Sequence, residues 1–216
     1  TRDFYLQDRN FWQLRYGITK ENLIEDKVFP IKKFKLFDTK TGDHMFRTDD
    51  IAYAYTEFKS GNKKIYRPKK KGNRRFITNC DAEDVGGMNT NITTGRLLII
   101  TKSYKDYRVL RNLGLNVRWL QNEGMFPDIE ILLSIVKRFE QVIVFFDNDV
   151  QGILSSQKLV DIINSYFPSK ANALWLSESL IRFGITDPSD LISKYVGESE
   201  KLIKTLFQMA RDRAVC

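Results

Sequence analysis

The sequence is poor in the residues from which disulfide frameworks and zinc sites are built. Among its 216 residues there are two cysteines, Cys80 and Cys216, and one histidine, His44. Two cysteines provide no disulfide framework, which fits a reducing compartment such as the cytoplasm. So few sulfur and imidazole ligands also exclude a zinc finger within this chain. Stability must come from a hydrophobic core, for which 42% hydrophobic residues suffice.

Long apolar runs are missing as well. No stretch approaches the roughly 20 apolar residues of a transmembrane helix, and residues 1–10 contain no apolar signal region. The first residue is Thr1 and not Met, which fits a fragment of a longer protein. No G-x-x-x-x-G-K-[ST] pattern occurs, which excludes an ATP-driven motor within this chain. These absences predict a cytoplasmic protein that does not enter a membrane.

The positive charge is concentrated in one segment. The net charge is +8, and the stretch from Phe58 to Cys80 holds nine basic residues and no acidic one. Cations bind phosphates and aromatic rings stack on bases, so this mixture predicts contact with single-stranded nucleic acid. A solvated basic loop is the alternative. The residues expected to contact nucleotide or DNA here are Lys64, Tyr66, Arg67, Lys69, Lys70, Lys71, Arg74 and Arg75.

Hydrophobic periodicity divides the chain in two. Residues 1–80 read as short helices followed by alternating strands at 31–37 and 51–58 and two further strands around the Lys-rich turn 69–73, a small α+β unit. Residues 81–96 are polar and Gly-rich and are expected to be a linker. In 97–216, strands expected at 97–101, 115–120, 142–146 and 173–176 alternate with helices, including 150–166 and one around 202–210. This alternation predicts a parallel sheet with right-handed crossovers.

Two carboxylates follow a short apolar run. Residues 142–146 (VIVFF) are typical of a strand buried on both faces, and Asp147 and Asp149 come directly after it. Functional residues of parallel sheets lie just past the carboxyl ends of strands. Carboxylates two positions apart in extended backbone point the same way and repel unless a cation neutralises them. Mg²⁺ prefers such oxygens, so the pattern predicts a metal site for phosphate chemistry. The alternative is an acidic turn that leads into a helix.

Several motifs in the second half occur in a recognisable order. TKSYKD (101–106), QNEG (121–124) and DND (147–149), with Gly152 after it, each follow an expected strand, and TDPSDL (186–191) comes last. Over roughly residues 95–195 this order resembles the Toprim domain of bacterial-type DNA primases, topoisomerases and some nucleases. FDND-x-x-G followed by DPSDL resembles the primase branch. FW-x₄-GIT, KKIYRP and RFITN in the first 80 residues look like the amino-terminal subdomain of phage-type primase cores.

The resemblance implies an α/β Toprim domain, a central parallel sheet flanked by helices, preceded by a small α+β subdomain. It implies a nucleotidyltransferase that uses Mg²⁺ or Mn²⁺ and ribonucleoside triphosphates to make short RNA primers on single-stranded DNA. The family's DxD pair falls on Asp147 and Asp149, and its later acidic pair resembles Asp187 and Asp190; Asp106 matches the last position of its Glu-Gly-x-x-Asp pattern. A replicative helicase and a zinc-binding module outside this chain are the implied partners, and the host cytoplasm is the implied location if a phage encodes the protein.

One residue departs from the family pattern. The Glu that ends the family's first strand falls on Lys102 here, and a cation cannot ligate a metal. Lys102, with Lys105, could instead bind a triphosphate, or Lys102 could mark a Toprim domain that has lost catalysis. Glu123 ends the neighbouring strand and is the candidate to supply the missing carboxylate, with a surface loop residue as the alternative. The expected catalytic residues are Asp147, Asp149, Lys102 and Glu123, and the expected metal ligands are Asp147, Asp149, Glu123 and Asp187.

Three other classes of protein compete with the primase interpretation. A haloacid-dehalogenase-like phosphatase also carries DxD after a buried strand, but there the motif usually opens the domain. A Toprim nuclease would cut DNA without nucleotides. A catalytically degenerate Toprim domain would only bind nucleic acid, and Lys102 makes this class the strongest competitor.

Overall fold

The computed structural model describes residues 1–38, 42–47, 51–89, 94–182 and 184–190. The chain forms two compact units, Thr1–Cys80 and Asp81–Cys216, and each is described by itself. Among the described residues, no helix has both the length and the apolar character needed to cross a membrane.

The first unit begins with short helices. Helix α1 (Leu6–Arg9) continues into a π-helical turn, η1 (Asn10–Leu14), and Gly17 then adopts a positive φ of 66°. Helix α2 (Lys20–Glu25) starts at Thr19, whose side chain accepts a hydrogen bond from the Asn22 N–H while the Asn22 side chain accepts one from the Thr19 N–H. Asn22 thus completes a capping box in which Glu or Gln is more usual.

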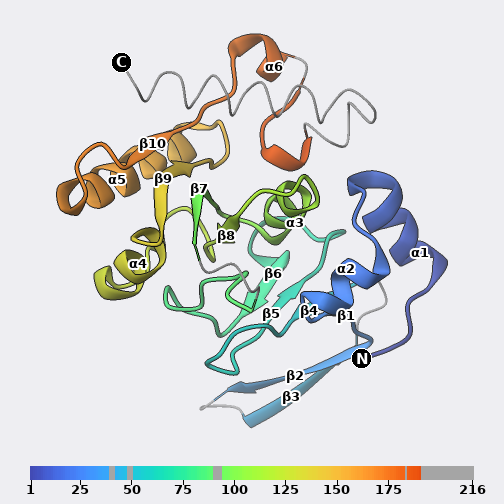
Figure 1. Cartoon of the computed structure of the whole chain (residues 1–216). Coiled ribbons are helices and arrows are strands. Elements are labelled where there is room, and N and C mark those ends of the chain that lie inside the picture. The colour runs from blue at the N-terminus through green and yellow to red at the C-terminus, as the bar shows by residue number, and fades with distance from the viewer. Residues whose placement is uncertain (39–41, 48–50, 90–93, 183, 191–216) are drawn as a thin grey trace. The chain divides into compact units, whose positions relative to one another are not determined.

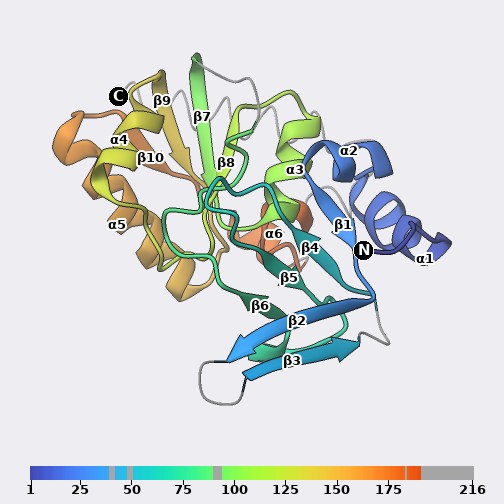
Figure 2. The same cartoon turned by 90° about the horizontal axis from the view of Figure 1, so that it is seen from below.

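Antiparallel strands complete the first unit. Four strands form a sheet in the order β1 (Val28–Pro30), β4 (Tyr53–Tyr55), β5 (Lys64–Tyr66) and β6 (Phe76–Thr78). Strands β2 (Lys33–Asp38) and β3 (Gly42–Arg47) form a separate ribbon (Figure 2), and a short 3₁₀ turn, η2 (Gly72–Arg74), precedes β6. The predicted α+β unit is confirmed, with an aromatic core that includes buried Trp12, Tyr16, Tyr53, Tyr55 and Tyr66.

The second unit contains the predicted parallel sheet. Its strands lie in the order β10 (Ala171–Ala173), β9 (Phe139–Val144), β7 (Gly95–Thr101) and β8 (Val117–Trp119), and all three pairings are parallel. The helices are α3 (Tyr104–Asn112), α4 (Ile129–Val136), α5 (Val150–Tyr166) and α6 (Glu178–Arg182) (Figure 1). A parallel sheet flanked by helices confirms the α/β fold class.

The core of the second unit lies between the sheet and the helices α4 and α5. Leu98 and Ile100 of β7 and Val142 and Val144 of β9 face the same side because side chains alternate along a strand. They pack with residues of α4 and α5 in one buried cluster. The connection through α3 runs in the opposite direction along the sheet, so right-handed crossovers place α3 on the other face.

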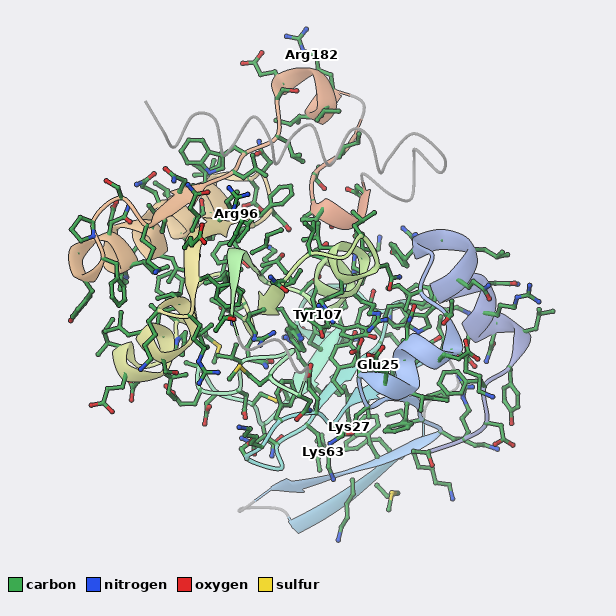
Figure 3. All side chains as sticks on the ribbon, in the orientation of Figure 1. Glu25, Lys27, Lys63, Arg96, Tyr107 and Arg182 are labelled. Atoms are coloured by element: carbon green, nitrogen blue, oxygen red, sulfur yellow. The ribbon has the colours of Figure 1, made fainter. Side chains whose placement is uncertain are left out.

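Element boundaries differ from the sequence expectations at several places. The strand expected at 115–120 is shorter, the one expected at 173–176 lies earlier as β10, and α6 was not predicted. The helix expected around 202–210 lies outside the described residues. The segment 81–96, expected to be a linker, belongs to the second unit: Val85 is buried there, and Gly86 pairs with Trp119. A Cβ on Gly87 would lie 2.6 Å from the ring of Tyr107 on α3, labelled in Figure 3.

Candidate functional site

The candidate site lies where the strand order of the second unit reverses. From β7 the chain moves to β8 on one side, and it returns to β9 on the other side of β7. Loops that leave two neighbouring parallel strands in opposite directions open a crevice at the carboxyl ends, where ligands of open α/β sheets bind. Lys102 directly follows β7, and Asp147 lies three residues past β9. The fold therefore places these two side chains at the reversal.

Three charged side chains meet at this edge. The Lys102 ammonium lies 2.7 Å from Asp147 Oδ2 and 2.9 Å from Glu123 Oε2, which follows β8. All three side chains are largely shielded, with exposed fractions of 16%, 28% and 21% for Lys102, Asp147 and Glu123. Burial disfavours the ammonium, but the two carboxylates outweigh burial and raise the pKa of Lys102. Lys102 is therefore charged and forms a bridge between the two acids.

Asp147 is half-buried and has carboxylates as well as Lys102 near it. Burial raises the pKa of Asp147; Lys102 opposes this, and repulsion from Asp187 and Glu123 adds to it, so the net shift is upward. Burial is the largest cause of this shift, and the neighbouring carboxylates add to it.

Asp149 has a local structural role. It is the N-cap residue of α5, and its Oδ1 accepts a hydrogen bond of 2.7 Å from the Gly152 N–H. The sequence left open that the two carboxylates only form an acidic turn that leads into a helix. Asp149 has that capping role, and Asp147 does not. Gly152 packs closely against the backbone of the same turn. A Cβ at this position would lie 2.1 Å from the Asp147 carbonyl oxygen, so only glycine fits.

The DPSD motif and α3 form a second charged group in this unit. The Lys105 ammonium lies 3.7 Å from Asp187 Oδ2 and donates a hydrogen bond of 3.1 Å to Ser189 Oγ. Asp106 is 1% exposed and accepts hydrogen bonds from the Ser103 hydroxyl at 2.6 Å and from the Ser189 N–H at 3.1 Å. Asp190 accepts hydrogen bonds from the N–H and the hydroxyl of Thr186 and so shapes the turn.

Burial, with repulsion from Asp187 and Asp147, raises the pKa of Asp106 to about 7. In the unfolded chain this carboxyl has a pKa of about 3.9. At pH values between the unfolded and the folded pKa, the unfolded state binds fewer protons than the folded state, so the free energy of unfolding falls as pH rises. We expect this fall to exceed about 1 kcal/mol between pH 5 and pH 7 and to be missing in Asp106→Asn. Urea unfolding of both proteins at each pH measures it.

The control for Asp106 is Asp161→Asn on the exposed surface of α5. That variant should keep the pH dependence of the wild type. A pH dependence in Asp106→Asn equal to that of the wild type would contradict the buried, proton-binding carboxyl.

Three positioning residues escaped the sequence analysis. Ser103 is the N-cap of α3 and also holds Asp106. The Asn148 side chain accepts a hydrogen bond of 2.7 Å from the Leu176 N–H, while its own N–H donates to the Thr186 carbonyl at 3.0 Å. Ser189 is fully buried between Asp106 and Lys105. Their only signal in the sequence was their place inside the motifs TKSYKD, DND and DPSD.

The donor chemistry of the site suits a hard divalent cation. Glu123, Asp147 and Asp187 offer carboxylate oxygens, the ligands that Mg²⁺ and Mn²⁺ accept, and the charges of Asp187 and Glu123 are felt at Asp147. Across the described residues, however, no group of three or more acidic, His or Cys side chains is arranged as a metal site. The Lys102 ammonium lies between the Asp147 and Glu123 oxygens instead. Their chemistry fits such a metal, because Mg²⁺ is usually held by one or two carboxylates together with waters and substrate phosphates.

The basic segment of the first unit is partly a core element. Tyr66 is 2% exposed and stacks on Phe76 at 5.0 Å, and the Lys64 ammonium lies 4.9 Å from the centre of the Phe76 ring. Arg75 donates a hydrogen bond of 3.2 Å to the Tyr66 hydroxyl. Phe76, at 39% exposure, is therefore the ring available to a base, and Tyr66 supports it from below. Cations on the exposed surface of this segment include Lys69, Lys71, Arg74 and Arg75, with Arg67 and Lys70 half-buried.

Comparison with solved structures finds similarity at low sequence identity. A DNA primase domain from Pseudomonas aeruginosa matches with a TM-score of 0.70 and 12% identity, covering 94% of this chain and 71% of that one. The primase fragment of the bacteriophage T7 primase-helicase protein matches with 0.56 and 14%, covering 81% and 66%. The DnaG primase catalytic domain bound to single-stranded DNA matches with 0.59 and 13%, covering 92% and 64%.

Comparison by sequence adds little. No protein-family model matches the chain. Vacuolar protein sorting-associated protein 4 of Dictyostelium discoideum is 28% identical over 103 residues, which cover 45% of this chain and 22% of that protein. The chain thus spans about a fifth of that relative and less than two thirds of the T7 fragment. The activities of these two proteins are therefore not assigned to this chain. The similarity to solved structures establishes the fold, and the chain has the fold of DNA primase catalytic cores, as its motifs predict.

Proposed function

We propose that this chain is the catalytic core of a DNA primase, which synthesises short RNA primers on single-stranded DNA with Mg²⁺ or Mn²⁺. The observation that carries the proposal is the meeting of Lys102, Glu123 and Asp147 at the reversal of strand order. The fold shared with primase catalytic cores supports it.

The residues of the second unit divide the work by charge. Glu123, Asp147 and Asp187 hold the metal, and Asp149 adds a carboxylate whose Oδ1 already caps α5. A metal held there would supply the positive charge that activates a 3′-hydroxyl and neutralises a triphosphate. Lys102 and Lys105 bind the phosphates of the incoming ribonucleotide, since catalysis of phosphoryl transfer is mostly positioning and charge stabilisation. Asp106 and Asn148 position the loops that carry these residues.

The direct test is incubation of the protein with single-stranded DNA, labelled ribonucleoside triphosphates and Mg²⁺ or Mn²⁺. Short labelled oligoribonucleotides that depend on template and metal are the expected product. DNA cleavage without nucleotides would point to a nuclease instead. A replicative helicase and a zinc-binding module outside this chain are the proposed partners. The source of one similar structure, a primase-helicase protein, agrees with the first of these.

The basic segment between β5 and β6 is proposed to bind the template backbone. Changing Lys69, Lys70 and Lys71 together to Gln should weaken binding about equally for all DNA sequences. If all three contact phosphate, the slope of log K against log salt should fall in magnitude by roughly 0.7 for each lost contact. Fluorescence anisotropy with a labelled single strand over a salt series measures the slope.

The control carries the same loss of charge elsewhere, with the exposed Lys137, Arg138 and Lys158 of the second unit changed to Gln. It should alter the slope less than the triple change in the basic segment. Equal slopes for the wild type and the Lys69–Lys71 variant would assign those lysines to a solvated turn.

One observation favours a second candidate, a Toprim domain that binds nucleic acid without catalysis. Lys102 occupies the position of the family's first Glu and is paired with Asp147. In that case single-stranded DNA would bind with the same salt dependence, but no oligoribonucleotide would form with either metal. The primer assay and the anisotropy measurement together separate the two candidates.

A further inference from the structure

The oxygens that would hold a metal are bound by the protein's own cation. Lys102 Nζ contacts Asp147 Oδ2 and Glu123 Oε2 at once, and the Lys102 side chain is 16% exposed. Both carboxylates come from strand ends on either side of β7, so the ammonium stands at the centre of the carboxyl edge. Lys102 thus pairs with both acids at the place expected for a metal ion, although its single charge balances only one of them.

We propose that Lys102 is an internal competitor of the metal: its ammonium occupies the Asp147–Glu123 pair, and a divalent cation enters only when the ammonium leaves. The inference rests on the proposed function for its biological meaning, since the competition would set the metal concentration at which primer synthesis begins. The competition itself is a property of the metal-binding equilibrium and can be measured without nucleotide or template.

The short distances make the two cations compete. Mg²⁺ or Mn²⁺ lies about 2.1 Å from a carboxylate oxygen, and the ammonium lies 2.7 Å from Asp147 Oδ2. Two cations on this oxygen would be less than about 5 Å apart, and like charges at that distance repel. Binding of one cation therefore opposes binding of the other.

The ammonium has a route away from the carboxylates. Lysine carries its charge on a flexible four-carbon stem with three rotatable donors, and the side chain retains some contact with solvent. When it swings out, the metal must replace two charge-assisted hydrogen bonds, which lowers the apparent affinity for metal. A ligand that draws the ammonium away, such as a triphosphate, therefore raises the affinity of the site for metal. By linkage, the metal raises the affinity for that ligand by the same factor.

The test is titration of the full chain with Mn²⁺, followed by the electron paramagnetic resonance signal of free Mn²⁺, without nucleotide or DNA. Lys102→Met removes the competing charge but keeps the length of the stem, and should bind Mn²⁺ roughly tenfold more tightly than the wild type, the effect of one ion pair of this kind. Lys102→Arg keeps a cation that can pair with both acids and should bind no more tightly than the wild type.

Lys105→Met is the matched control, because it removes the same charge from the same unit. Lys105 lies 3.7 Å from Asp187, farther than Lys102 lies from its two acids, so its loss should tighten Mn²⁺ binding by less. If both Met variants bound Mn²⁺ more tightly by the same factor, the effect of Lys102 would be that of any nearby positive charge. That result would overturn the proposed competition. Unchanged, weaker or undetectable Mn²⁺ binding in Lys102→Met would overturn it as well.

A measurement on the wild type removes dependence on variants. The ¹H–¹⁵N spectrum of lysine ammonium groups should contain a slowly exchanging Lys102 signal that is lost or shifted on addition of Mg²⁺; a signal that Mg²⁺ leaves unchanged would overturn the proposal. Failure of the proposed function gives a different pattern. If no protein makes primers but Lys102→Met binds Mn²⁺ more tightly, the competition holds and the primase proposal fails. If the wild type makes primers and binds Mn²⁺ with the same affinity as Lys102→Met, the primase proposal holds and the competition fails.

Discussion

Asp147→Asn should reduce primer synthesis by a factor on the order of 10² or more while the protein remains folded. Asn has nearly the same shape as Asp but no charge, so the change removes the proposed metal ligand and the ion-pair partner of Lys102 without opening a cavity. The loss of repulsion from Glu123 and Asp187 offsets the loss of the ion pair, so the free energy of unfolding should change little. The measurement is the initial rate of labelled oligoribonucleotide formation, with urea unfolding as the check on stability.

Asp149→Asn is the informative companion. Asn caps a helix as well as Asp does, so the hydrogen bond to the Gly152 N–H and the stability of α5 should persist. If Asp149 is a metal ligand, the variant loses activity; if it acts only as a cap, activity remains. Primer synthesis by Asp147→Asn at the wild-type rate would refute the assignment of the metal site.

Gly152→Ala should destabilise the second unit by about 2–4 kcal/mol, near the upper end of overpacking effects. Alanine normally favours a helix over glycine by roughly 1 kcal/mol, but here its Cβ would lie 2.1 Å from the backbone oxygen of Asp147. Backbone cannot turn aside as a side chain can, so the loop that carries Asp147 must move. We therefore expect loss of primer synthesis together with the lower stability seen in urea unfolding.

Gly124→Ala is the matched control for Gly152→Ala. The nearest atom to a Cβ on Gly124 is Asn122 Oδ1 at 3.5 Å, an ordinary contact, so stability should change by less than about 0.5 kcal/mol. Gly152→Ala as stable as the wild type would mean that the turn after Asp147 yields without cost.

The sequence predicted the fold of the second unit because its strongest signals were local. The run 142–146 and the amphipathic segment 150–166 each specify an element by periodicity, and α5 has the expected bounds. The edge strand was misplaced because Trp175 and its apolar neighbours resemble a strand, although Trp175 is 45% exposed and β10 ends at Ala173. Apolar residues alone do not separate an edge strand from the loop that follows it.

The site was predictable only as far as strand ends are predictable. Placing Lys102, Glu123 and Asp147 at one edge follows from a parallel sheet, but the direct bridge between them depends on distances that no pattern contains. The burial of Asp106 and Tyr66 could not be predicted either, because their sequence neighbours suggest the opposite. A charge in a helix and an aromatic ring in a basic segment both suggest an exposed surface, and tertiary packing reversed this.

The two hydrogen bonds of Asn148 hold together the two ends of one stretch of the chain. They fix Leu176 and Thr186 to one residue, so the intervening stretch, which includes α6, leaves and returns at the same point. The cost of closing a loop grows slowly, by about 0.6 kcal/mol for each doubling of its length. Insertions between these two anchors would extend outward without moving Asp147 or Asp187. Natural relatives could therefore differ in this stretch, and a reporter domain could be inserted there, while the geometry of the edge is kept.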